Sequence, residues 1–311
     1  MTDRWRHLEV ADQWGRRAIV TGANSGLGYV STLALATAGA EVVMAVRDLD
    51  RGQAAAQRIR EHVPDAKLRV IHLDLAEPAS VRDFAAGLVD EPEPVDILMN
   101  NAGVMLVPRR EITTGGFERQ MGVNHLGHFA LTVGLLPALR RSAGGARVVS
   151  VTSLTYARVG PLYHGLGLTG KYAPMRAYGQ SKLAVALFAQ ELHRRAAAAA
   201  LPVISVLAHP GWSATAEGRP DDGAGRSVRF ARRATALLGS QPAQGARAQL
   251  YAATAPELTG GEFIGPSKLG RGAPVAATLS GVAADPEAAG WLWDESVRLT
   301  GADPHLLPGK A

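Results

Sequence analysis

Apolar and polar positions follow two alternating patterns along the first two thirds of the chain. Short apolar runs predict β-strands at residues 18–21, 41–46, 68–73, 95–99, 146–151 and 202–207. The apolar-periodic or alanine-rich stretches between them predict helices at residues 26–38, 50–62, 79–89, 117–140 and 176–199. Asp50 is the expected N-cap of the second helix. Repeated strand–helix units predict an α/β fold with a single doubly wound parallel sheet and helices on both faces.

The last third of the chain is less regular. Residues 212–226 are rich in Gly, Asp and Arg and predict a loop, either a lid over a substrate or ordinary surface. Helices are expected at residues 227–238, 244–255 and 286–299, with Trp291 and Trp293 packed inward, and a last edge strand at residues 261–264. We therefore expect one domain over residues 1–311, in which residues 15–215 bind nucleotide and carry catalysis and residues 216–311 supply the substrate loop and C-terminal helices.

Composition narrows the classes of function. The chain has 311 residues, 47% of them apolar, and no cysteine, which excludes disulfides and thiolate catalysis. No apolar run reaches the roughly 18 residues of a membrane span, and residues 1–15 lack the apolar centre of a signal peptide, so a cytoplasmic protein is expected. The nine histidines lack metal-ligand spacing, which predicts no metal site. The net charge is +5, but the basic residues form scattered pairs, so we expect an anionic cofactor and no nucleic-acid partner.

A glycine-rich turn follows the first predicted strand. Residues 21–28 read Thr-Gly-Ala-Asn-Ser-Gly-Leu-Gly and precede an apolar helix. Glycine lets a ligand approach the backbone closely, and a helix N-terminus presents unpaired N–H groups to a phosphate. The spacing differs from the common G-x-G-x-x-G fingerprint, and a structural turn is the alternative. The turn predicts a Rossmann-type dinucleotide site made by Gly22, Asn24, Ser25, Gly26, Leu27 and Gly28.

Further cofactor candidates follow the later strands. Arg47 ends the second strand, where an arginine accommodates the 2′-phosphate of NADP and an acidic residue accepts the 2′-hydroxyl of NAD. NADP(H) is therefore favoured over NAD(H), unless Arg47 is merely an exposed charge beside a helix. Asp74, which Leu75 follows, either accepts from the adenine amino group or caps the next helix. The remaining candidates are Asn101, Ala102 and Gly103 beside a cofactor ribose, and Pro210, Gly211 and Thr215 near the nicotinamide, where residues 209–211 could equally form a simple turn.

Tyr178 and Lys182 form the centre of the predicted chemistry. They are four residues apart and share one helix face. A free tyrosine titrates near pH 10, and a nearby ammonium lowers that pKa, so the pair can exchange a proton near neutrality. Ser153 follows the fifth strand and is placed to bond the reacting oxygen, whereas the pleat should turn Ser150 and Thr152 to the opposite face.

Taken together, these motifs resemble the short-chain dehydrogenase/reductase family over about residues 15–215. Residues 47–48 and 124–129 resemble its retinol dehydrogenase and WW-domain oxidoreductase branch. The resemblance implies that Tyr178 is the general acid/base, that Lys182 holds the nicotinamide ribose and lowers the pKa of Tyr178, and that Ser153 orients the substrate oxygen. It also implies that Asn124 holds a water in a proton relay, although its apolar surroundings alone would indicate a core amide. A homo-oligomer is a further expectation from the family.

The predicted function is that of an NADP(H)-dependent oxidoreductase, which moves a hydride between nicotinamide and a carbonyl or alcohol. Apolar residues between Ser153 and Tyr178 favour a lipophilic substrate. The alternative is a non-catalytic NAD(P)-sensing module that binds a partner protein, although such a sensor could have lost any of Asn124, Ser153, Tyr178 and Lys182. A hydrolase is disfavoured because the G-x-S-x-G turn is absent.

Overall fold

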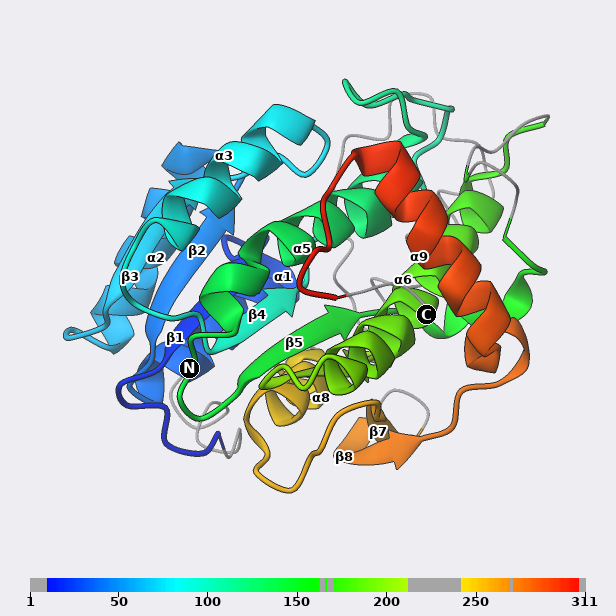
Figure 1. Ribbon diagram of the computed structural model, residues 1–311. Helices are drawn as coiled ribbons and strands as arrows, with labels where there is room; N and C mark the ends of the chain where they lie inside the picture. The colour runs from blue at the N-terminus through cyan, green and yellow to red at the C-terminus, as the bar shows by residue number, and fades with distance from the viewer. Residues whose placement is uncertain (1–9, 163–165, 167–170, 212–241, 269–270, 308–311) are drawn as a thin grey trace.

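A single eight-stranded sheet forms the centre of the molecule (Figure 1). The computed structural model describes residues 10–162, 166, 171–211, 242–268 and 271–307. The strand order is β3-β2-β1-β4-β5-β6-β7-β8, and every neighbouring pair except the last is parallel. The strands are β1 (Arg17–Thr21), β2 (Glu41–Val46), β3 (Leu68–His72), β4 (Ile97–Asn100), β5 (Ala146–Val151), β6 (Val203–Ala208), β7 (Phe263–Lys268) and β8 (Arg271–Ala277). The predicted doubly wound parallel sheet is confirmed.

The far edge of the sheet differs from the prediction. The expected edge strand at residues 261–264 begins only at Phe263, and it is not the edge, because β8 pairs antiparallel with it. β8 contains Pro274 and Gly272, residues that weaken a strand signal in the sequence. Pro274 lies on an edge strand, where a missing N–H is tolerated.

Helices cover both faces of the sheet. α1 (Gly26–Thr37), α2 (Leu49–His62) and α8 (Pro242–Thr254) pack on one face. α3 (Pro78–Val89), α5 (Gly127–Leu139), α6 (Pro174–Ala198) and α9 (Pro286–Thr300) pack on the other, with α9 lying alongside α6 (Figure 1). Asp48, not Asp50, is the N-cap of α2, because its Oδ1 accepts from the backbone N–H of Arg51 at 3.0 Å. Asp50 lies in the first turn, where a carboxylate still favours the helix dipole.

The predicted helix over residues 117–140 is confirmed as continuous helical structure over residues 119–139, and it contains a π-helical turn. Glu118 caps a short helix, α4 (Arg119–Met121), by accepting from the N–H of Met121, and a π-helical turn, η1 (Gly122–Leu126), then leads into α5. Gly127 N–H donates to Gly122 O, five residues back. The carbonyl of Leu75 lies so close that a Cβ on Gly127 would stand 2.4 Å from it. This close contact with a loop distant in sequence leaves no room for a side chain at position 127, and helical periodicity alone does not indicate the π-helical turn.

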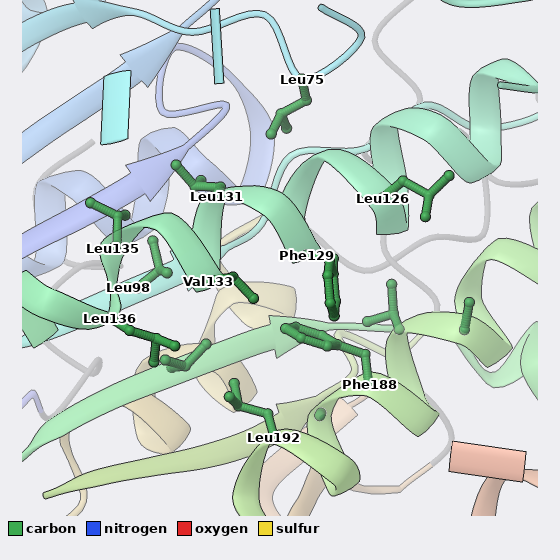
Figure 2. Packing of buried hydrophobic residues seen from close by; sticks show 14 of the residues in the cluster. Leu75, Leu98, Leu126, Phe129, Leu131, Val133, Leu135, Leu136, Phe188 and Leu192 are labelled. Carbon is green, nitrogen blue, oxygen red and sulfur yellow. The ribbon is translucent and has the colours of Figure 1, made fainter. Parts of the chain in front are cut away.

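Alternation along the strands divides the core into two clusters. Ile19 of β1 joins one cluster, and its neighbours Ala18 and Val20 join the other. On the α5–α6 side, Figure 2 shows Phe129 facing Phe188, with ring centroids 5.7 Å apart. Trp293 of α9 stacks edge-on against Phe129 at 5.0 Å and is buried, while Trp291 is partly buried against the same cluster, so the predicted inward packing is confirmed.

Two expected features cannot be placed. The predicted loop at residues 212–226 and the helix at residues 227–238 lie outside the described residues. Within the described part of the chain, no helix has both the length and the apolarity that crossing a bilayer requires.

Candidate active site

The glycine-rich turn after β1 leaves its backbone open toward α1. Gly22 has φ 67° and Gly26 has φ 53°, values that side chains disfavour. Ser25 is the N-cap of α1, but its hydroxyl accepts no bond from the helix, so first-turn N–H groups are left for a ligand. Leu27 is buried in the core behind the turn, so its contribution to a cofactor site is through the main chain. The turn therefore has the shape and polarity of a phosphate-binding site.

The turn is hydrogen-bonded to Asn101 and Ala102, directly before Gly103. Thr21 Oγ accepts from the backbone N–H groups of Asn101 and Ala102, each at 2.9 Å, and Asn101 Nδ2 donates to Thr21 O at 2.7 Å. A Cβ on Gly103 would stand 3.1 Å from Asn124 Oδ1 and 3.6 Å from Lys182 Nζ. The segment after β4 thus lies between the glycine-rich turn and the predicted catalytic residues, as a cofactor spanning both would require.

Gly28 permits the closest approach in this region. A Cβ on Gly28 would stand 2.2 Å from Gly22 O and 2.7 Å from Asn101 Nδ2. We expect Gly28→Ala to displace the turn, to lower the unfolding free energy by about 1–3 kcal/mol and to weaken NADPH binding at least tenfold. Urea titration and NADPH fluorescence measure the two effects.

Gly87→Ala in α3 is the matched control for Gly28→Ala. A Cβ there meets no atom within 4 Å, so it should stabilise the helix by about 0.5–1 kcal/mol and leave cofactor affinity unchanged. Equal NADPH affinity in the wild type and in Gly28→Ala would contradict cofactor binding at this turn.

Arg47, Asp74 and Leu75 occupy the ends of β2 and β3. Arg47 is exposed, directly after β2. Asp74 does not cap α3, whose N-cap is Glu77; its Oδ1 accepts from Ala76 N–H at 2.9 Å and shapes the loop. The Leu75 side chain is buried in the core cluster drawn in Figure 2, so only its main chain is available to a cofactor.

A pocket beside the glycine-rich turn contains residues that the sequence analysis missed. Its volume is about 210 Å³, and Asn24, Ser25 and Gly26 form one side of it. Arg51 and Arg58 of α2 line the other side, with the Arg58 guanidinium 5.0 Å from the Tyr29 ring centroid. The two arginines are seven residues, or about two turns, apart, so their shared helix face was the signal available in the sequence. The pocket is suited to an anion.

Tyr178, Ser153 and Lys182 meet at the carboxyl end of β5. Ser153 is the N-cap of the short helix η2 (Leu154–Arg158) and hydrogen-bonds to the Tyr178 side chain. Lys182 Nζ lies 5.9 Å from the Tyr178 ring centroid and donates to Val151 O at 2.8 Å. Thr152 does not turn away as predicted, because β5 ends at Val151; its Oγ1 donates to Lys182 O at 2.7 Å and ties β5 to α6.

Burial is the largest influence on the electrostatics of this group. Burial raises the pKa of Tyr178 to about 12, and the hydrogen bond from Ser153 opposes that rise. Burial lowers the pKa of Lys182 to about 8. The ammonium of Lys182, 5.9 Å from the Tyr178 ring centroid, is placed to favour the phenolate, and the lowering of the phenol pKa by Lys182 stays a prediction. At neutrality the tyrosine is a neutral proton donor beside a protonated lysine.

Asn124 lies in the π-helical turn with its side chain fully bonded. Its Oδ1 accepts from Val104 N–H at 2.8 Å, and its Nδ2 donates to Val104 O and to Ser181 Oγ. This is the core-amide arrangement, and the role of Asn124 in holding a relay water stays a prediction. π-Helical turns are frequent at functional sites, and here the turn places Asn124 next to Gly103.

The last predicted contacts follow β6. Gly211 has φ 69°, and its N–H donates to His209 Nδ1 at 3.1 Å, so the turn after Pro210 is held by the preceding histidine. Thr215 lies outside the described residues.

Comparison with known proteins agrees with this geometry. Residues 16–220 match the family model described as short chain dehydrogenase. The chain is 45% identical to polyprenol dehydrogenase of Mus musculus, over 93% of this chain and 85% of that protein. It is 40% identical to retinol dehydrogenase 13 of Homo sapiens, over 93% of this chain and 86% of that protein. A solved structure of an uncharacterized protein from Mycobacterium paratuberculosis is 38% identical, with a TM-score of 0.78 over 96% of this chain and 97% of that one.

Proposed function

The chain belongs to the short-chain dehydrogenase family, and we propose that it is an NADP(H)-dependent oxidoreductase acting on a lipophilic carbonyl or alcohol. The observation that carries the proposal is the meeting of Ser153, Tyr178 and Lys182 beside Gly103, next to the open turn after β1. Family membership supports the oxidoreductase class. The intact set of four residues gives no support to the alternative of a non-catalytic sensor.

The residues present fit a nicotinamide dinucleotide. Gly22, Gly26 and Gly28 form a concave stretch of backbone, where an added Cβ would fill the space or strain the backbone. The first turn of α1 offers N–H groups to the phosphates of the cofactor. Residues 101–103, with main-chain atoms of Leu75 and Gly211, would hold the rest of the cofactor. When bound, the cofactor supplies the hydride. Residues 15–215 would carry this chemistry, and residues 216–311 would complete the substrate side.

The protein's own residues supply the proton. With its pKa near 12, Tyr178 is protonated at neutrality and can donate its hydroxyl hydrogen to a carbonyl oxygen as negative charge develops there. Ser153 would donate a second hydrogen bond to the same oxygen and fix its position. The positive charge of Lys182 favours the phenolate that Tyr178 becomes after it has donated its proton. In the alcohol-oxidising direction the same groups take the proton back.

Apolar groups next to the catalytic residues support a lipophilic substrate. Leu154 follows Ser153 and is 47% exposed, and Met175, one turn before Tyr178, is 49% exposed. These exposed apolar side chains, close in sequence to catalytic residues, are available for contact with an apolar substrate. The names of the two relatives, polyprenol dehydrogenase and retinol dehydrogenase, point to substrates of the same chemical character.

Turnover of NADPH by the wild-type protein tests the proposal. We expect absorbance of NADPH to fall with retinal or a polyprenal, and more slowly with small hydrophilic ketones. A protein that binds NADPH but turns over no carbonyl or alcohol in a broad panel would overturn the assignment and favour the sensor.

Cofactor preference depends on charge at the 2′-phosphate. We expect Arg47→Gln and Arg51→Gln each to weaken NADPH binding about tenfold or more, because a charge-assisted hydrogen bond is lost, with NADH binding unchanged. Calorimetric titration of both cofactors measures the ratio. Arg82→Gln on the exposed side of α3 removes one positive charge elsewhere and is the matched control. Equal losses of affinity for NADPH and NADH would contradict a role of Arg47 and Arg51 in binding the 2′-phosphate.

A further inference from the structure

A buried histidine connects the two halves of the active site. His128 lies in the first turn of α5, 3% exposed, in a helix that is otherwise apolar around it. Its Nε2 lies 2.9 Å from Thr21 Oγ, and its Nδ1 lies 3.1 Å from the main-chain oxygen of Asn124. Thr21 belongs to the cofactor side, and Asn124 belongs to the catalytic side. An apolar residue in the same space would avoid the free-energy cost of burying a polar ring, so the imidazole needs an explanation.

The hydrogen bonds allow a single arrangement of protons. Thr21 Oγ already accepts from the N–H groups of Asn101 and Ala102. Its one hydrogen is therefore free to be donated, and His128 Nε2 is a nearer acceptor than Met99 O, at 2.9 Å against 3.3 Å. A carbonyl oxygen can only accept, so His128 Nδ1 must carry the hydrogen that bonds to Asn124 O. Burial lowers the pKa of His128 to about 4, so the ring is neutral and carries only that hydrogen.

The chain of bonds continues from Asn124 to the catalytic tyrosine. Asn124 Nδ2 donates to Ser181 Oγ at 2.9 Å, and Ser181 Oγ donates to the main-chain oxygen of Tyr178 at 2.8 Å. The Asn124 side chain also holds both polar main-chain groups of Val104, next to Gly103. A shift of Asn124 would thus move both Tyr178 and the segment that separates it from the turn after β1.

We infer that His128 is a positioning residue of the reaction, a neutral imidazole fixed as the Nδ1–H tautomer that joins the cofactor-facing ends of β1 and β4 to the catalytic helix through Asn124. It touches neither substrate nor cofactor. Its effect on turnover rests on the proposed function, whereas its tautomer and its effect on cofactor affinity do not.

Two conservative variants separate the two ends of the ring. His128→Asn places a side-chain N–H near the position of Nδ1 and keeps the donation to Asn124 O, but it loses the contact with Thr21. His128→Gln places a polar atom near the position of Nε2 and keeps the contact with Thr21, but it leaves Asn124 O without its donor. We expect His128→Asn to weaken NADPH binding about tenfold with kcat little changed, and His128→Gln to lower kcat about tenfold with NADPH affinity little changed.

His125 provides the matched control. It is also buried, in the η1 turn that precedes α5, but its Nε2 bonds to Ser296 Oγ on α9 and not to a residue of the glycine-rich turn. His125→Gln can keep that bond, and it should change stability without separating kcat from NADPH affinity. Turnover is followed with NADPH and retinal, and affinity with NADPH alone by calorimetry.

The proton arrangement can be seen directly by ¹⁵N NMR of histidine-labelled protein at neutral pH. Of the nine histidines, the signal that disappears in the His128 variants should show a protonated Nδ1 and an unprotonated Nε2. An Nε2–H tautomer, or His128→Asn and His128→Gln behaving alike in kcat and affinity, would overturn the inference. Wild-type protein that turns over no carbonyl would count against the proposed function, while the ¹⁵N signals and NADPH affinities would still decide the role of His128.

Discussion

Replacing Tyr178 with phenylalanine is expected to lower kcat by about 10²–10⁴-fold while NADPH binding stays essentially unchanged. The change removes one hydroxyl, the only part of this side chain that can donate a proton. Burial raises the pKa of Tyr178 to about 12, so in the wild type that proton is held until a carbonyl oxygen gains negative charge. Ser153 keeps its hydroxyl in the variant and can still position a carbonyl, so KM should change less than kcat. Steady-state kinetics with NADPH and retinal give both values.

A second tyrosine controls for simple loss of a hydroxyl. Tyr251 on α8 hydrogen-bonds to Glu257 and is remote from the Ser153–Tyr178 contact. Tyr251→Phe should leave kcat unchanged. If Tyr178→Phe kept wild-type turnover, the proton donor would have to be another group, and the assignment of Tyr178 as general acid would be wrong.

Mild acid is expected to lower the unfolding free energy by about 5 kcal/mol between pH 7 and pH 5, a large part of the stability of a typical domain. Burial lowers the pKa of His125 to about 3 and the pKa values of His128 and His209 to about 4. In the unfolded chain the histidine pKa is about 6.5. Below pH 6.5 the unfolded state binds protons that the native state excludes, so each histidine removes stability as the pH falls, at about 1.4 kcal/mol per pH unit.

The neighbouring charges do not reverse this direction. Beyond the larger effect of burial, the positive charge of Lys182 lowers the pKa of His128, and electrostatic repulsion from His128 lowers the pKa of His125. Carboxylates change the unfolding free energy in a lower pH range. Hydrogen bonds from arginines lower the pKa values of Glu91 and Glu191 below the usual 4.5, so their contribution is present above that pH and is lost only below it. The range from pH 7 to pH 5 therefore isolates the histidines.

Urea unfolding followed by circular dichroism at pH 7, 6 and 5 measures the effect. His125→Gln/His209→Gln removes two of the three groups and should retain only about a third of the wild-type pH dependence between pH 7 and pH 5. The variant leaves the bonds of His128 intact. A double variant with the full wild-type slope would show that other groups take up the protons.

Local sequence was sufficient for the sheet and for most residues of the candidate site. Apolar runs and helical periods depend on neighbours along the chain, and six of the parallel strands were predicted near their observed positions. Because the carboxyl ends of neighbouring parallel strands lie at the same end of the sheet, residues after β1, β4 and β5 had to lie near one another. Tyr178 and Lys182, four residues apart, had to share a face of α6. These expectations follow from the spacing of residues along the sequence, which is the same before and after folding.

Tertiary structure alone decided how those residues behave. Gly127, which follows the π-helical turn, lies against the carbonyl of Leu75, a residue distant in sequence. The pKa of Tyr178 is set by loss of water around it, and the tautomer of His128 is set by bonds to Thr21 and Asn124. Desolvation and hydrogen bonds between distant segments exist only after packing. For this protein the sequence determined which groups reach the site, and the fold determined which of them hold a proton and where it points.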